Sequence, residues 1–270
     1  MPLSTDARAH TLDGAIGERP LRFGQLFGRI ALAGVAAGLA AGVFSLLVTE
    51  RVVSRALELE KTRAAAGGAH GHGNELFDRG QQLVGGFLGT VFAGVVLAIM
   101  FAVVYAVVRH RLPGRTDVGR TAVLTAMGFS IFALLPALVI PANPPAVGDP
   151  GTVGARTATY GAVLLLGVIS AMLVSALVSA LRSHGAGLAG TAIGAVVATV
   201  ALVTLSLLVV PGNPDPMAAD VPASLVWDFR LASIGQLAVL WGTLGLTAGR
   251  LLDRVERSST AHPAARATPA

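Results

Sequence analysis

Two histidines and a glutamate in a glycine-rich stretch are the strongest candidates for chemistry in this chain. His70, His72 and Glu75 fall within Gly67–Glu75, whose glycines let the backbone fold around an ion. Imidazole and carboxylate groups are suitable ligands for divalent nickel, cobalt and zinc. We therefore predict a metal contact at His70, His72 and Glu75, with the upstream Glu50 as a further ligand. An ordinary polar loop is the alternative interpretation.

A second candidate site is the proline-rich stretch Pro141–Pro150, of sequence PANPPAVGDP. Its prolines leave backbone carbonyls without helical partners, and Asn143 and Asp149 add side-chain oxygens. Oxygen atoms of these kinds coordinate hard cations, so Asn143 and Asp149 are kept as candidate metal ligands. The alternative is a rigid turn in which Asp149 pairs with Arg156, which makes Arg156 a structural residue.

The stretch Trp227–Arg230 combines an aromatic ring with two opposite charges. We predict that Trp227 anchors a helix at the membrane surface and that Asp228 and Arg230 form a salt bridge. Catalysis is not expected, because no Ser/His/Asp, HExxH or paired-carboxylate pattern stands within the apolar segments. The only lysine, Lys61, follows a glutamate, which excludes a P-loop, and the absence of cysteine excludes iron–sulfur clusters.

The elements that carry these residues follow from composition. Of 270 residues, 53% are hydrophobic and 13% charged, and the mean hydropathy is +0.70. A soluble protein has about 25% charged residues, so the chain is predicted to be an all-α integral membrane protein. Six apolar segments are long enough to span a bilayer. They are residues 30–48, 83–108, 122–140, 160–181, 188–210 and 231–249.

The six segments define the predicted domain organisation. Residues 1–28 form a polar cytoplasmic tail, residues 29–252 a polytopic membrane domain, and residues 253–270 a disordered cytoplasmic tail. Residues 50–82 form an exterior amphipathic segment followed by the histidine loop. Thirteen lysines and arginines flank the segments on the side of both tails, against seven on the other, which predicts that both termini are cytoplasmic. We interpret the excess of basic over acidic residues as this topology signal. Binding to nucleic acid, which a basic chain can also indicate, is therefore not expected.

Glycines at four-residue spacing suggest how the segments pack. Gly34, Gly38 and Gly42 form a double GxxxG pattern, which lets two membrane helices approach closely. The same spacing recurs at Gly85/Gly89, Gly190/Gly194 and Gly245/Gly249. The apolar interiors of the first five segments hold no Asp, Glu, Lys, Arg or His, which disfavours a self-contained proton pump.

Together these residues resemble the CbtA family of predicted cobalt-transporter subunits. The resemblance runs from about Gly24 to Gly249. It is carried by the glycine-rich first segment, Glu50, the His70–Glu75 loop, Pro141–Pro150 with Arg156 and Tyr160, and the sequence WDFRLAS at Trp227–Ser233.

The resemblance implies a protein of the bacterial cytoplasmic (inner) membrane that supplies cobalt for cobalamin synthesis. It also implies a small His-bearing membrane partner of CbtB type and about five membrane helices, so five is the alternative to six. We expect cobalt(II) or nickel(II) as the transported ion, no permanently bound cofactor, and a homo-oligomer as a further form of assembly. The competing hypotheses are a non-transporting membrane scaffold and an exterior metal sensor.

Overall fold

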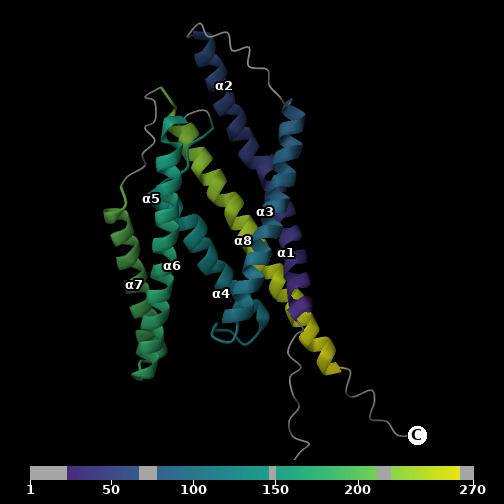
Figure 1. Ribbon diagram of the computed structural model, residues 1–270, viewed down its shortest axis with the longest axis vertical. Helices are drawn as coiled ribbons and strands as arrows, with labels where there is room; N and C mark the ends of the chain where they lie inside the picture. Colours follow the sequence, from purple (N-terminus) through teal and green to yellow (C-terminus); the bar gives the residue numbers. More distant parts are fainter. Residues whose placement is uncertain (1–22, 67–77, 146–149, 212–219, 262–270) are drawn as a thin grey trace, which may run out of the picture.

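The computed structural model describes residues 23–66, 78–145, 150–211 and 220–261, which are helical apart from short connections (Figure 1). Six helices in these ranges are long and apolar enough to cross a membrane, which confirms the prediction of six rather than five. The elements are α1 (Phe23–Phe44), η1 (Ser45–Thr49), α2 (Glu50–Ala66), α3 (Arg79–Val108), α4 (Asp117–Phe129), η2 (Ser130–Leu134), α5 (Leu135–Val139), η3 (Pro150–Thr152), α6 (Val153–Ser183), α7 (Leu188–Val209) and α8 (Ala223–Ala261).

The spans alternate in direction along the chain. The start of α1 and the end of α8 lie together at the lower end of Figure 1. Helix α2 and the starts of α3, α6 and α8 lie at the upper end. We call these the terminus end and the α2 end. The segments predicted to be exterior therefore share one end of the molecule.

Helices α1 and α3 pack most closely, and glycine makes their contact possible. A Cβ added to Gly38 would lie 2.6 Å from the Cα and 2.8 Å from the carbonyl oxygen of Val91. Gly34 meets Ala98 and the backbone of Gly94 in the same way. With no side chain between them, the two backbones touch, as GxxxG packing requires.

Helices α4 and α8 form a second close contact, in which threonines face glycines. A Cβ on Gly249 would lie 2.5 Å from the Thr121 hydroxyl oxygen and from the Cα of Val118. The Thr121 hydroxyl lies 2.9 Å from the carbonyl oxygen of Gly245 on α8. Because α8 also packs along α1, the four helices α1, α3, α4 and α8 form one packed core.

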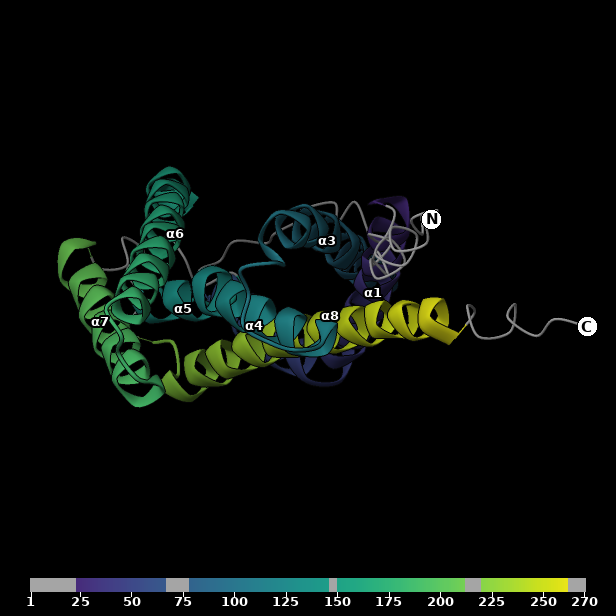
Figure 2. The same cartoon turned by 90° about the horizontal axis from the view of Figure 1, so that it is seen from below.

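Helices α6 and α7 stand to one side of this core as a hairpin (Figure 2). Only 11% and 6% of the residues in their apolar windows are buried, against 28% to 39% in the other four spans. The hairpin reaches the core through α5, where Val163 of α6 packs with Leu135, Val139 and Val210. Glycine spacing alone did not identify close contacts, because Gly85, Gly89 and Gly190 all face open space.

Two π-helical turns, η1 and η2, interrupt the spans. Pro136 follows η2, and its ring would clash with the carbonyl four residues earlier in a regular α-helix, so the wider turn relieves that conflict. Turn η1 joins α1 to α2 without a break in the helix, and Val52, Ala56 and Leu59 recur at helical spacing in α2. Thr49 of η1 donates a hydrogen bond of 3.0 Å to Gln236 of α8.

The helices extend further than the apolar segments. The last segment was predicted at residues 231–249, yet α8 runs from Ala223 to Ala261 and enters the range predicted as a disordered tail. Hydropathy marks the part of a helix that suits a bilayer, whereas the helix itself ends where its backbone hydrogen bonds end. Arg250 and Asp253 are compatible with a helix that continues into water.

Candidate functional site

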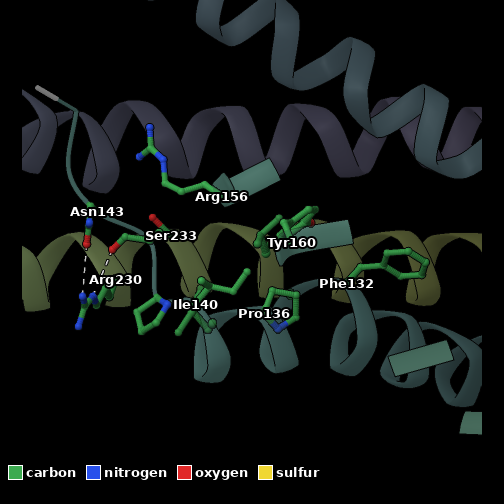
Figure 3. A pocket seen from close by; sticks show the side chains of 14 residues that line it. Phe132, Pro136, Ile140, Asn143, Arg156, Tyr160, Arg230 and Ser233 are labelled. Atoms are coloured by element: carbon green, nitrogen blue, oxygen red, sulfur yellow. Dashed lines mark hydrogen bonds between the residues drawn. The ribbon is translucent and has the colours of Figure 1, made fainter. Parts of the chain in front are cut away.

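A cavity of about 300 Å³ opens between the core and the α6–α7 hairpin (Figure 3). It is built from residues of η2, α5, the segment after α5, α6 and α8. Its lining comprises Phe132, Ala133, Pro136, Ala137, Ile140, Pro141, Ala142, Asn143, Arg156, Tyr160, Arg230, Ser233, Ile234 and Leu237. The cavity therefore joins the two stretches that the sequence singled out separately, Pro141–Pro150 and Trp227–Arg230.

Asn143, Arg230 and Ser233 lie together at one end of the cavity, Phe132 lies at the other, and Tyr160 lies between them (Figure 3). Arg230 of α8 anchors the polar end through two hydrogen bonds. Its Nε donates to the carbonyl oxygen of Ala142 at 3.2 Å, and its Nη2 donates to Oδ1 of Asn143 at 3.3 Å. The side-chain oxygen of Asn143, a candidate metal ligand, thus accepts a hydrogen bond from a guanidinium group.

The predicted salt bridge between Asp228 and Arg230 is wrong. Asp228 pairs instead with Arg55 of α2, with 2.9 Å between Oδ2 and Nη2. Residues two apart on an α-helix do not face each other, so the two side chains of the WDFR stretch meet different neighbours. Trp227 is 61% exposed at the same end, as a residue that anchors a helix at a membrane surface would be.

Arg156 and Tyr160 line the cavity from the first turns of α6. They lie one helical turn apart, which places both side chains on the same face of the helix. The partner predicted for Arg156, Asp149, lies outside the described residues. Arg156 and Arg230 are the two charged residues of the lining, and its remaining members are mostly apolar.

This composition does not suit a bare divalent cation. Among the residues that the structure describes, the lining contains no carboxylate and no imidazole, while two guanidinium groups belong to it. Divalent metals are held by anionic or strongly donating groups. Asn143 is the one predicted metal ligand among the described lining residues, and Asp149 lies outside them.

Three ion pairs hold α2 against its neighbours at the same end. Besides the Arg55–Asp228 pair, Arg63 Nε lies 2.7 Å from Oδ2 of Asp220, and Arg79 of α3 contacts Glu50. We call these three pairs the α2 clamp. Beneath it, Val52 and Ala56 are buried against Leu225 and Ala232 of α8. The clamp fixes the direction of α2, from whose end the histidine loop departs.

One ion pair of the clamp, Arg79 with Glu50, holds the Glu50 carboxylate in place. Its carboxylate contacts Arg79 and lies 3.4 Å from the Ser54 hydroxyl, so it is engaged in an ion pair. The other predicted ligands, His70, His72 and Glu75, lie outside the described residues. Within the ranges that the structure does describe, no group of three or more His, Cys, Asp or Glu side chains could hold a metal ion.

At the terminus end, the structure shows a buried ionisable residue that lies outside the predicted apolar segments. Asp117 begins α4 and is 0% exposed. Its Oδ1 accepts a hydrogen bond of 2.5 Å from the buried hydroxyl of Tyr105 and lies 3.5 Å from Nη1 of Arg120. Its backbone N–H donates to Asp253 of α8 at 2.8 Å. Asp117 therefore joins α3, α4 and α8.

Only one sequence signal pointed to this cluster. Thr116 caps α4 by accepting a hydrogen bond from the backbone N–H of Gly119, so a T-D pair before an apolar run marks a helix start. That signal locates the start of the helix but does not show that Asp117 is buried. The burial of Asp117 depends on its contacts with Tyr105 and Asp253, which lie elsewhere in the sequence.

Comparison with known proteins gives one match. The model of the CbtA family, described as a probable cobalt transporter subunit, matches residues 23–253. No curated protein and no solved structure matches the chain. The matched range begins with α1 and ends at Asp253, so it covers all six spans and both ends of the cavity.

Proposed function

Because this chain belongs to the CbtA family of probable cobalt transporter subunits, we propose that it is the membrane-embedded subunit of a cobalt uptake system that supplies cobalamin synthesis. The observation that carries the proposal is the family match across the whole six-span region. Cobalt is the cargo that the family name supports. Nickel is kept as a second cargo, because N/O ligands bind nickel at least as tightly as cobalt.

Metal capture is assigned to the histidine loop at the α2 end, through His70, His72 and Glu75. Two features of the described residues support this choice. The described part of the cavity lining offers no carboxylate or imidazole, and Glu50 is already paired with Arg79. The α2 clamp and the apolar contact of Val52 and Ala56 with α8 position α2, the helix that precedes the loop in the chain.

The family name describes a subunit, so the chain works within a complex. We assign its partner to a small His-bearing membrane subunit of CbtB type, with a homo-oligomer as a second form of assembly. The sparse burial of α6 and α7 leaves both helices open to contact with such a partner or with lipid.

The α2 end is assigned to the exterior and the terminus end to the cytoplasm of a bacterial inner membrane. Arginines support this orientation, since the terminus end carries most of those beside the spans. They are Arg29, Arg109, Arg111, Arg115, Arg120, Arg182, Arg250 and Arg254. A doubly charged cation that enters the cell down a membrane potential of 100 mV gains about 4.6 kcal/mol of free energy. This gain is large enough to drive cobalt uptake without another energy source.

Alanine substitution of the loop tests this function. The variant H70A/H72A/E75A should lose most cobalt accumulation in cells that depend on this system, measured with radioactive cobalt. The matched control H110A/H184A removes two histidines at the terminus end and should retain uptake. Equal uptake by both variants would remove the loop from the mechanism. Loss of uptake in the control as well would indicate misfolding rather than loss of a ligand.

A non-transporting scaffold is the second candidate function, together with a metal sensor. The favouring observation is that the described residues hold no cluster of three or more metal-binding side chains. Purified chain in liposomes loaded with a metal-sensitive dye separates the hypotheses. Cobalt entry without any partner would rule out the scaffold. Cobalt binding without entry, with or without the partner, would favour the sensor.

A further inference from the structure

The third membrane span changes neighbours at its π-helical turn. Its first part, α4, packs along α8 of the core, where Gly128 faces the ring of Trp241. Its last part, α5, packs with the α6–α7 hairpin instead, where Leu135 and Val139 contact Val163. Turn η2 lies between the two parts, so this span leads from the core to the hairpin (Figure 2).

Consecutive residues of η2 contact the two sides. A Cβ added to Gly167 of α6 would lie 3.0 Å from Cγ2 of Ile131, so Ile131 packs on the hairpin. The next residue, Phe132, stacks on Trp241 of α8, with 6.1 Å between the ring centroids. The change of neighbours therefore takes place within η2 itself.

The backbone of η2 is also the weakest part of this span. The N–H of Leu135 donates to the carbonyl oxygen of Ser130, five residues earlier, as in a π turn. Pro136 has no N–H, so it cannot donate the next bond of the helix. Prolines and π turns are the places where helices bend, and hinges form at a few residues that absorb a change in backbone angles.

The hairpin has few other contacts with the core in the part of the chain that the structure describes. Helices α6 and α7 pack mainly on each other, on η2 and on α5, rather than on α1, α3, α4 or α8. The cavity of about 300 Å³ lies at the same joint, with η2, α5 and α6 on one side and α8 on the other. A hairpin that approaches α8 would therefore meet open space rather than packed side chains.

We propose that η2 is a hinge about which α5 and the α6–α7 hairpin move as one body against the core, so that the cavity widens and narrows. The stacked rings of Phe132 and Trp241 form the pivot. Helix α6 meets η2 at Gly167, and its last residue, Ser183, lies sixteen residues further on, about 24 Å along the helix axis. That end of the hairpin moves the most. The inference rests on the packing of the third span and holds whichever ion the chain moves.

Distances between pairs of spin labels test the hinge. Because the chain has no cysteine, labels can be attached at introduced cysteines alone. Full-length chain in lipid nanodiscs is measured by double electron–electron resonance. The pair V107C/L188C joins core and hairpin, V107C/L231C lies within the core and L165C/L188C within the hairpin, and all four side chains are more than half exposed. The first pair should give a clearly broader or two-peaked distance distribution than the other two. A distribution as narrow as theirs would overturn the proposal.

Stiffening of the turn tests whether the movement arises at η2. Deletion of Ala133 together with P136A makes the third span a continuous α-helix and should narrow the core–hairpin distribution to the width of the other two pairs. P136A alone restores the missing N–H and should narrow the distribution less. The control P113A, in the connection between α3 and α4, should leave it broad. An unchanged width in P136A, and in the deletion variant where circular dichroism shows it folded, would refute the hinge.

Discussion

The core helices α1, α3, α4 and α8 and the α6–α7 hairpin are all apolar enough to cross a membrane but are held in very different ways. In the core, backbones touch at glycines, and buried polar groups connect helices, as at Gly38 with Val91 and Asp117 with Tyr105. In the hairpin, hydroxyls such as that of Ser206 bond to carbonyls of their own helix. Hydrophobicity alone does not bring helices together in a bilayer, so the difference lies in small residues and polar links.

This difference assigns separate tasks to the two regions. The core has the contacts of a rigid unit, and it carries the α2 clamp at one end and Asp117 at the other. The hairpin is attached mainly through α5 and beside the cavity, so its position is the more easily adjusted. Contacts with a partner or a lipid are expected to alter the hairpin first.

The largest expected effect is the removal of Asp117 from the core. D117A should lower the free energy of unfolding by roughly 3–5 kcal/mol, because Arg120 and Tyr105 would lose a buried partner. Unfolding by SDS titration in mixed micelles measures this change. D117N retains an acceptor for Tyr105 and should fall between D117A and the parent. A D117A variant within about 0.5 kcal/mol of the parent would contradict the description of this cluster as a core link.

Glycine substitutions compare the two regions directly. G38L should destabilise the protein by about 1–3 kcal/mol or more, because the new side chain would meet the backbone of Val91. G190L places the same side chain on α7, where nothing lies within 4 Å, and should leave stability unchanged. Equal losses in the two variants, measured by thermal unfolding in detergent, would mean that the hairpin is as tightly packed as the core.

A substitution at the junction between the hairpin and the core should change stability less than the substitutions in the core. V163A removes two buried methyl groups from the contact with Leu135 and Val139 and should lower stability by about 1–2 kcal/mol. Because the chain has no cysteine, a single pair introduced across α5 and α6 can report on this junction. V163A should accelerate reduction of that disulfide by an added thiol such as dithiothreitol, which attacks the bond and is itself oxidised, and an unchanged rate would show that the junction does not depend on Val163.

The smallest effect is expected at the α2 clamp. Arg55 and Asp228 are about half exposed, so a double-mutant cycle of R55Q and D228N should give a coupling energy below about 1 kcal/mol. Salt at 1 M should remove most of it through screening. A larger coupling that persists in salt would show that the pair is shielded from water, by lipid or by a partner.

The sequence predicted the class and the six spans because apolar length is a local property. It also brought Pro141, Arg156 and Arg230 to attention separately, but it did not predict that they line one cavity. That arrangement depends on how α6 and α8 pack around η2, which no local pattern encodes. Asp117 was missed for the same reason, since its burial comes from Tyr105 and Asp253.

Glycine spacing shows the limit of a motif most clearly. Gly34 and Gly38 contact α3, whereas Gly85 and Gly89 carry the same spacing on the partner helix and face open space. A GxxxG motif indicates only that another helix can approach its glycine face closely. Whether a helix does pack on that face depends on the arrangement of the remaining spans, which the glycine spacing does not predict.

Turn η1 makes the geometry of the α2 clamp depend on the residue count of the first span. A π-helical turn holds about one residue more than an α-helical turn, so deletion of one residue within Ser45–Thr49 would convert it to an α turn and leave the direction of α2 largely unchanged. An inserted residue has no such outlet and would rotate the whole of α2 relative to α1 by about 100°. Arg55 and Arg63 would then point away from Asp228 and Asp220 although every residue of α2 was unchanged. The first span therefore sets the phase of α2, and insertions in η1 should be far less tolerated than deletions or substitutions at the same positions.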